Sequence, residues 1–298
     1  MMQLILVTGM SGSGKSIVLN ALEDSGYFCI DNLPVGFIEP IAESLQSRSF
    51  PRLAIAADTR MREDVRAIRL TLERLQSASI EVRLLFLNAR TDALIQRYSE
   101  TRRRHPLSLR PEAIEALGLE GQEESSSLLE CIEHEREILV DIEKLGVQLD
   151  TTDLKPAALR AWVREFLQLK SGRISLMFQS FAYKDGIPLD ADLVFDVRCL
   201  SNPHYIEELK PLTGLDPKVA SYLANKTQAA SLIEDIASFL QRWIAEFEHD
   251  QRSYLTVALG CTGGQHRSVY CAEQLAKKFY GQWPCLVRHR GLSLKGLG

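Results

Sequence analysis

The sequence has few of the features that mark secreted, membrane-spanning or zinc-binding proteins. Its six cysteines include no C-x-x-C pair, which argues against a zinc site or a redox dithiol. No apolar run approaches the roughly 20 residues that a helix needs to cross a bilayer. The chain also enters its first apolar run without the basic stretch and apolar core of a secretory leader. These absences predict a cytoplasmic protein with reduced thiols and no membrane association.

The sequence also lacks a large excess of charge of either sign. It carries 35 Lys and Arg against 39 Asp and Glu, a net charge of -4. Such a chain has no global attraction to nucleic acids or membranes, so any binding of that kind must come from local patches. With 298 residues, of which 45% are hydrophobic, the chain is expected to form about two globular domains.

A glycine-rich stretch near the N-terminus is the most informative part of the sequence. It fits the phosphate-loop pattern G-x-x-x-x-G-K-[ST] at every fixed position, between an apolar run at 4–7 and a helix-like run at 17–22. Glycines let the backbone wrap a phosphate, and the following helix N-terminus attracts the anion. The stretch predicts an ATP site in which Lys15 reaches the β- and γ-phosphates and the Ser16 hydroxyl binds Mg²⁺. Its residues are Gly9, Met10, Ser11, Gly12, Ser13, Gly14, Lys15 and Ser16.

Two acidic residues follow predicted strands, where the carboxyl ends of a parallel sheet line a ligand crevice. Asp58 ends the apolar run that starts at Leu53, and we expect it to hold Mg²⁺ and to act in catalysis together with Lys15. Arg60, just beyond, is a candidate contact to a phosphate or to the base. Asp31 follows the predicted strand 27–30 and is either a ligand-side acid or a turn former before Pro34.

Several arginines follow the fourth predicted strand, at 82–87. They resemble the lid of a small-molecule kinase, because the guanidinium group stays charged and binds phosphate through two donors. The alternative is a solvated basic helix end. The stretch 112–135, with eight Glu and no Lys or Arg, is predicted to be a mobile, solvated insertion without a site. The arginines are Arg97, Arg102, Arg103 and Arg104.

The order of apolar runs predicts two α/β domains. The first is a kinase-like phosphate-loop domain over 1–168, a parallel sheet with helices on both faces. It ends with a fifth strand at 147–150 and a helix whose apolar positions are Leu159, Trp162, Val163, Phe166 and Leu167. Residues 168–173 are polar and small, and are the candidate linker. A second α/β domain over 174–298 is expected to have strands at 174–178, 193–197 and 254–260, a loop at 203–218 and a helix at 229–247.

A second strand, glycine-rich turn and helix begins at Tyr254. Backbone N–H groups of Cys261–Ser268 again form a candidate anion site, to which His266 and Arg267 can add charge and which Arg198 and His204 can complete. Cys261 and Arg267 also have the C-x5-R spacing of cysteine phosphatases. However, those enzymes usually carry His where this chain has Gly260, so we favour a non-covalent anion site, with a purely structural turn as the third possibility.

The last 39 residues are locally basic. From Gly260 onward they contain six Lys or Arg and one Glu, which are candidate contacts to the phosphates of an RNA or, alternatively, an ordinary solvated surface. The tail 291–298 is expected to be mobile. The basic residues that we consider for RNA contact are Lys277, Lys278, Arg288, Arg290 and Lys295.

Taken together, these stretches resemble the RapZ/YvcJ family of bacterial nucleotide-binding proteins. The resemblance covers nearly the whole chain. It is carried by Gly9–Ser16, Ala21–Asp24 with Asp31–Pro34, Tyr98–Arg103 with His105–Leu107, Gly186–Pro188, Phe195–Arg198, Asn202–His204 and Ser253–Ser268.

The resemblance implies binding and slow hydrolysis of ATP and GTP. It places ATP at Gly9–Ser16 and a guanine-nucleotide stretch at Asp58, Thr59, Arg60 and Met61. It also implies that the second domain senses an amino-sugar phosphate and presents a small regulatory RNA to a ribonuclease, although this chain ends without the lysine- and arginine-dense tail used for RNA. The implied second pocket contains Asp196, Arg198, His204, Thr262, Gly263, His266 and Arg267.

Three functions are therefore predicted. The first is a regulatory ATPase or GTPase whose second domain senses a phosphorylated metabolite. The second is an RNA-binding adapter, and the third is a small-molecule kinase. The sequence leaves ATP versus GTP open, because it contains no guanine-reading N-K-x-D stretch, and it is compatible with a homo-oligomer.

Overall fold

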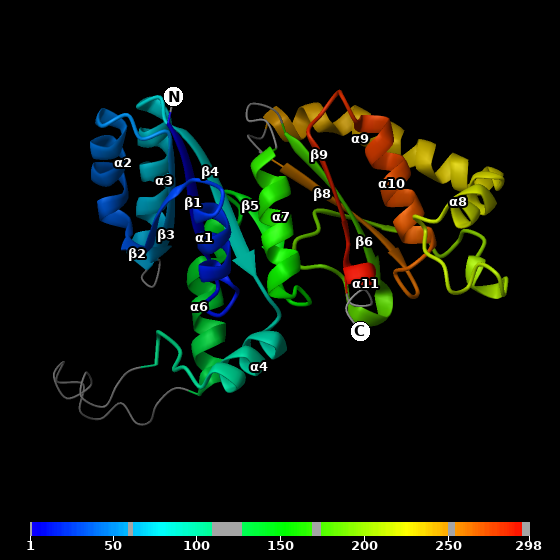
Figure 1. Cartoon of the computed structure of the whole chain (residues 1–298), viewed down its shortest axis with the longest axis horizontal. Helices are drawn as coiled ribbons and strands as arrows, with labels where there is room; N and C mark the ends of the chain where they lie inside the picture. Colours follow the sequence, from blue (N-terminus) through cyan, green and yellow to red (C-terminus); the bar gives the residue numbers. More distant parts are fainter. Residues whose placement is uncertain (1, 59–61, 109–126, 169–173, 250–253, 294–298) are drawn as a thin grey trace. The chain divides into compact units, whose positions relative to one another are not determined.

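The protein is described by a computed structural model that covers residues 2–58, 62–108, 127–168, 174–249 and 254–293. The chain divides into two compact units, Met1–Arg164 and Glu165–Gly298. Each unit has its own parallel sheet with flanking helices (Figure 1). This architecture confirms the predicted α/β fold class.

The described part of the first unit is built on a five-stranded sheet of order β2-β3-β1-β4-β5, in which every neighbouring pair is parallel. Its helices cover both faces, with α1 and α7 opposite α2 and α3 (Figure 1). The strands are β1 (Gln3–Gly9), β2 (Phe28–Pro34), β3 (Arg52–Asp58), β4 (Glu81–Asn88) and β5 (Val147–Asp150). The helices are α1 (Lys15–Glu23), η1 (Val35–Phe37), α2 (Ile38–Ser47), α3 (Arg62–Ser77), α4 (Thr91–Thr101), α6 (Leu128–Glu143) and α7 (Pro156–Gln168).

The central strand β1 shows why this sheet forms. Leu4, Ile5, Leu6 and Val7 are all buried, because alternate side chains meet helices on opposite faces of the sheet. Leu4 and Leu6 share one core with residues of α2, α3 and α6. The sheet thereby holds the C-terminal end of β1, where the phosphate loop begins, between the ends of β3 and β4.

Strand β2 is longer than the sequence predicts. It continues through Asp31 to Pro34 and resumes its pairing with β3 after a register shift between Ile30 and Leu33. Asn32 takes up the irregularity with φ of 56°, a conformation that Asn tolerates. Asp31 therefore lies in an exposed, irregular strand and not in a turn, which was one of the two roles considered for it.

The predicted solvated insertion at 112–135 is wrong for its last eight residues, which form the first half of helix α6. Ser127 caps this helix by accepting from the Glu130 N–H, and the Glu130 carboxylate accepts from the Ser127 N–H. This reciprocal capping and the burial of Ile132 and Ile138 on one face stabilise the helix, although its acidic composition indicated a solvated segment. Residues 109–126 lie outside the described residues.

The second unit has a parallel sheet of order β7-β8-β6-β9 in its described residues. Its strands are β6 (Ser175–Ala182), β7 (Leu193–Asp196), β8 (Tyr254–Cys261) and β9 (Cys285–His289). Its helices are η2 (Tyr183–Asp185), η3 (Pro203–Tyr205), α8 (Pro217–Ala224), α9 (Thr227–His249), α10 (Arg267–Phe279) and α11 (Arg290–Ser293). The long α9 and α10 pack with β6 and β8 in one core.

Strand β9 was not predicted from the sequence. It follows Pro284 and ends in two polar residues, Arg288 and His289, so the sequence shows no extended apolar run there. The structure supplies their partners: Arg288 Nη1 lies 3.3 Å from Asp190 Oδ2, and His289 Nδ1 lies 2.9 Å from Ser180 Oγ. The linker residues 169–173 and the tail residues 294–298 lie outside the described residues. The prediction of a mobile tail is wrong for residues 291–293, which belong to helix α11.

Among the described helices, none has the length and the apolar character that a membrane span needs.

Candidate functional site

The phosphate loop leaves β1 at Gly9 and enters α1 at Lys15. Gly9 has φ of 126°, and a Cβ at this position would lie 2.1 Å from the carbonyl oxygen of Leu87 on β4. Gly14 precedes the helix with φ of 105° in the left-handed region. Both positions thus exclude a larger residue, and the glycine pattern follows from the path of the backbone.

Donors gather at the start of α1, as an anion site requires. The first N–H groups of a helix have no partner within the helix and carry its positive dipole. Ser13 Oγ is buried and has no hydrogen-bond partner in the described part of the chain. Lys15 Nζ donates to the carbonyl oxygens of Gly9 at 2.6 Å and Met10 at 3.1 Å, folding over the start of the loop. Ser16 is exposed beside them.

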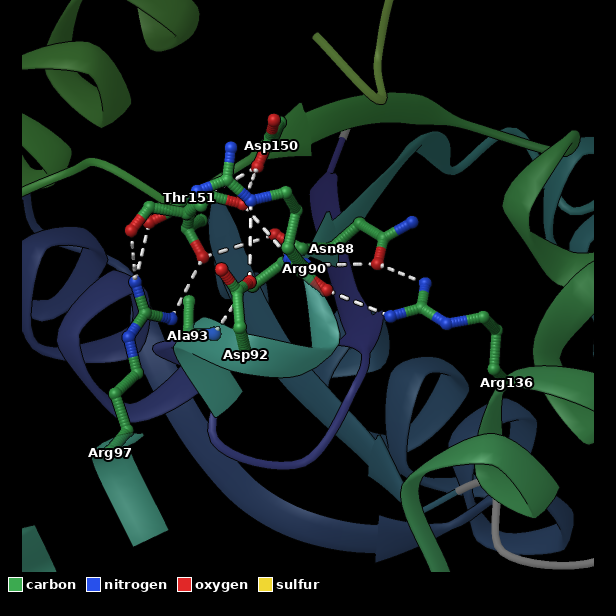
Figure 2. A network of polar contacts seen from close by, with 10 residues as sticks. Asn88, Arg90, Asp92, Ala93, Arg97, Arg136, Asp150 and Thr151 are labelled. Carbon is green, nitrogen blue, oxygen red and sulfur yellow. Dashed lines mark hydrogen bonds and ion pairs between the residues drawn. The ribbon is translucent and has the colours of Figure 1, made fainter. Parts of the chain in front are cut away.

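The outer side of the loop is held by neighbouring elements. Arg97 on α4 donates from Nη1 to the Gly12 carbonyl at 3.1 Å. Its Nη2 donates to the Thr151 carbonyl (Figure 2). Thr151 in turn donates to the Ser13 carbonyl at 2.9 Å. The Tyr98 ring lies close against Gly12. These bonds hold the carbonyl groups of Gly12 and Ser13 from outside the loop.

This placement changes the role that the sequence predicted for Arg97. Its guanidinium is tied to backbone carbonyls and positions the loop, so it is not a free lid arginine. Burial lowers the pKa of Arg97, and the carboxylates of Asp150 and Asp153 oppose that effect. Arg102, Arg103 and Arg104 are exposed beyond the end of α4.

A second polar network fixes the carboxyl ends of β4 and β5 beside the loop (Figure 2). Arg136 on α6 donates from Nη1 to Asn88 Oδ1 and from Nη2 to the Ala89 carbonyl, both at 2.8 Å. The Arg90 N–H donates to Thr152 Oγ1 at 2.9 Å, and Asp150 Oδ1 accepts from the Thr152 N–H at 2.9 Å. These bonds give the edge of the site a defined shape.

Glu135 on α6 is a site residue that sequence reasoning missed. Its Oε2 accepts from the Ser11 N–H at 2.8 Å and its Oε1 from the Ser11 hydroxyl at 2.6 Å. His105 Nε2 lies 3.3 Å from Oε2, and the Glu135 side chain is buried. The capping box at Ser127 and Glu130 was the available signal, because it marks a helix that carries Glu135 inward.

The Mg²⁺ expectation rests on Ser16 and Asp58. The β1–β3 register pairs Val7 with Ala56, so the backbone of Asp58 lies level with Gly9. The Asp58 side chain and residues Thr59, Arg60 and Met61 lie outside what the structure describes, so these predictions stay predictions. Within the described ranges, no group of three or more His, Cys, Asp or Glu is arranged to hold a metal ion.

The second loop, in the C-terminal unit, leaves β8 at Cys261 and enters α10 at Arg267. Arg267 is buried and donates from Nη1 to the carbonyls of Arg198 at 2.8 Å and Leu200 at 3.1 Å. Its Nε is buried without a hydrogen-bond partner in the described residues. Gly263 has open space around its Cβ position. Arg267 thus fastens the loop to the segment after β7, and the anion site stays a prediction.

Arg198 and Asp196 lie at the rim of this loop. Arg198 Nη2 is 2.6 Å from Asp196 Oδ2, and its guanidinium carbon stacks 4.0 Å above the Tyr183 ring centroid. The hydrogen bond from Arg198 lowers the pKa of Asp196. Arg198 is thus held over the face of the tyrosine ring.

The predicted charge on His266 is not supported. Burial lowers the pKa of His266 from 6.5, and the nearby His204 adds to that effect, while hydrogen bonds to backbone carbonyls oppose it. Nε2 of His266 donates to the Leu209 carbonyl at 3.2 Å. His266 is therefore neutral near neutral pH and positions the loop. The ring centroids of His204 and His266 are 6.4 Å apart.

The cysteine-phosphatase alternative has no support in this geometry. Cys261 is buried, and its Sγ lies 3.1 Å from Ser268 Oγ. Reactive cysteines are usually partly exposed, so the burial of Cys261 argues against this alternative.

Two family models together match almost the whole chain. The RapZ-like N-terminal domain matches residues 2–171, and the RapZ C-terminal domain matches residues 174–293. The chain belongs to the RapZ family. The boundary between the two matches falls in the polar segment at 168–173.

Curated relatives agree with this membership. A nucleotide-binding protein of Methylibium petroleiphilum is 49% identical over 295 residues, covering 97% of this chain and 94% of the relative. One of Methylobacillus flagellatus is 50% identical over 292 residues, covering 98% and 99%. The shikimate kinase of Bacteroides thetaiotaomicron aligns over 56% of this chain and 98% of its own, with 13% identity and a TM-score of 0.31.

The basic residues considered for RNA are largely engaged in this RapZ-family chain. Arg288 and Arg290 are buried, which corrects their assignment to an exposed basic surface. Lys278 is exposed but pairs with Glu234. Lys277 is exposed, and Lys295 lies outside the described residues.

Proposed function

We propose that this chain binds ATP or GTP with Mg²⁺ at Gly9–Ser16 and hydrolyses it slowly in a regulatory role, in the cytoplasm. The names of its curated relatives, nucleotide-binding proteins, support this proposal. The observation that carries it is the donor-lined loop at the start of α1, in which Ser13 Oγ is buried without a partner among the described residues. Such an orphaned donor indicates a ligand that supplies the acceptor.

The loop fits the nucleotide chemistry. Lys15 would neutralise the β- and γ-phosphates, and the loop N–H groups would bind their oxygens. The Ser16 hydroxyl and Asp58 would hold Mg²⁺, which supplies charge neutralisation at the terminal phosphates. In this proposal Asp58, Thr59, Arg60 and Met61 form the guanine-nucleotide stretch.

Titration calorimetry of the full chain with ATP and with GTP, each with Mg²⁺, tests this function. Lys15→Ala is expected to weaken binding and to abolish phosphate release. Lys144→Ala is the matched control, because Lys144 is an exposed lysine of the same unit at the end of α6. Unchanged affinity and hydrolysis in Lys15→Ala would refute the proposal.

The second part of the proposal concerns the C-terminal loop, which we infer senses an amino-sugar phosphate. Thr262, Gly263 and the partnerless Nε of Arg267 support an anion site, and the Arg198–Tyr183 stack at its rim supports a ligand larger than phosphate alone. Asp196 would face the amino group, while His204 and His266 would shape the pocket.

Calorimetric titration of the full chain with glucosamine 6-phosphate, and with inorganic phosphate for comparison, tests this part. Arg198→Ala is a better test than a substitution of Arg267, because Arg198 is exposed, whereas Arg267 fastens the loop. Arg242→Ala removes an exposed arginine from α9 as the control. Equal binding by wild type and Arg198→Ala would contradict the assignment. The RNA-adapter, kinase and homo-oligomer alternatives stay predictions, and no contact in the described residues favours them.

A further inference from the structure

The phosphate loop already holds an anion, the carboxylate of Glu135. Its two oxygens accept from the Ser11 N–H and the Ser11 hydroxyl at 2.8 and 2.6 Å. A backbone N–H together with a serine hydroxyl is also the donor pair that a phosphate loop offers to phosphate oxygens. The carboxylate comes from α6, 124 residues away in sequence.

His105 fixes the carboxylate in place. The Leu107 N–H donates to His105 Nδ1 at 3.2 Å, so Nδ1 carries the lone pair and Nε2 carries a proton. Nε2–H then donates to Glu135 Oε2 at 3.3 Å. The carboxylate thus receives three donors in a buried site, and these bonds act with the charge of Lys15 to lower the pKa of Glu135, although burial alone would raise it.

Lys15 is the second charge involved. Its ammonium, the group that would meet the β- and γ-phosphates, lies on the carbonyls of Gly9 and Met10, directly before Ser11. The field of Glu135 therefore acts at the end of the loop where a terminal phosphate would bind.

We propose that Glu135 is a specificity-determining residue that competes with the terminal phosphate of a nucleotide for the Ser11 end of the loop. The proposal rests on the nucleotide function proposed above. The terminal phosphate of a nucleoside triphosphate must displace this carboxylate from the Ser11 donors or share them with it, and the two negative groups repel each other. A diphosphate reaches less far along the loop. His105 holds Glu135 in place, so the two residues together set the preference between diphosphates and triphosphates. In the sequence they lie on either side of residues 109–126.

The test uses a variant that removes the charge and keeps the shape. In Glu135→Gln the amide oxygen can accept from the Ser11 N–H and from His105, and the amide nitrogen can donate to the Ser11 hydroxyl. Glu137→Gln is the control, because it removes the same charge from an exposed position of the same helix. The full chain is titrated with Mg²⁺ and with ADP, GDP and non-hydrolysable analogues of ATP and GTP.

Glu135→Gln is expected to bind the triphosphate analogues about tenfold more tightly and to change diphosphate affinity far less, because Coulomb repulsion from a nearby buried charge is only partly screened. His105→Phe, which keeps a ring beside Tyr98 and removes the donor, should shift the preference in the same direction. Glu137→Gln should change neither affinity.

A triphosphate affinity that is unchanged or lower in Glu135→Gln overturns the proposal. Reduced affinity in Glu135→Ala with wild-type affinity in Glu135→Gln would make Glu135 a clamp of the loop, which also overturns it. These outcomes are separable from failure of the nucleotide function, in which neither wild type nor Glu135→Gln binds any nucleotide and Lys15→Ala changes nothing.

Discussion

The hydroxyl of Thr151 donates to the carbonyl oxygen of Ser13 at 2.9 Å, across 138 residues of sequence. Thr151 follows the edge strand β5, and Ser13 lies in the phosphate loop that follows the central strand β1. One buried bond therefore joins the edge of the sheet to its centre. The geometry of the loop thus depends on residues that its own motif does not contain.

Thr151→Val tests this dependence, because it keeps the side-chain shape and removes the hydroxyl. We expect a loss of about 1–3 kcal/mol in unfolding free energy, since a buried carbonyl loses a donor, together with weaker nucleotide binding. Urea denaturation and calorimetry measure the two effects. Thr101→Val, an exposed threonine on α4, should be nearly neutral, and equal behaviour of the two variants would contradict the prediction.

Gly9→Ala should unfold the first unit or destabilise it by at least about 3 kcal/mol, because φ of 126° is unfavourable for alanine and the new Cβ meets the Leu87 backbone. Thermal unfolding followed by circular dichroism measures the loss. Gly36→Ala is the control, since nothing lies within 4 Å of a Cβ there. A Gly9→Ala protein as stable as wild type would show that the loop backbone differs from the one described.

Acid should weaken the first unit through Glu135. Its pKa is lowered in the folded state relative to 4.5, so the ionised form stabilises the fold. This stabilisation is fully present above 4.5 and is lost as the pH falls through the lower folded-state value. The difference in unfolding free energy between wild type and Glu135→Gln should therefore shrink as the pH is lowered below 4.5, as measured by denaturation at a series of pH values. A difference that does not vary with pH would contradict it.

Arg288→Met should destabilise the second unit strongly. Asp190 is fully buried and Arg288 nearly so, and removing one member of a buried pair leaves a charge without compensation, at about 3–5 kcal/mol. Lys278→Met breaks an exposed pair with Glu234 and should cost under about 1 kcal/mol. Denaturant midpoints compare the two variants. Similar small losses in both would show that the Asp190–Arg288 pair is not buried in solution.

The features that sequence reasoning predicted well are those encoded locally. The phosphate loop and β5 were placed correctly because a glycine pattern or an apolar run is sufficient evidence for each. Strand β9 was missed because its two terminal residues are polar and find partners only through Asp190 and Ser180, about 100 residues earlier.

The site residues divide in the same way. Lys15 was identified by its motif. The positioning role of Arg97 depends on Thr151, 54 residues further on, so the sequence indicated a lid contact for this arginine. Glu135 was hidden in an acidic stretch, where composition indicated solvent exposure and only the capping box at Ser127 indicated a helix.

The bond between Ser13 and Thr151 also has a consequence for the order of events on the ribosome. The phosphate loop is encoded in the first sixteen residues, but the groups that hold it come from α4, α6 and the end of β5. A nascent chain that has not yet released residue 151 therefore lacks the donor to Ser13. The full set of contacts that holds the loop therefore forms only after about half of the polypeptide has emerged, although the sequence motif is among the first parts to be synthesised.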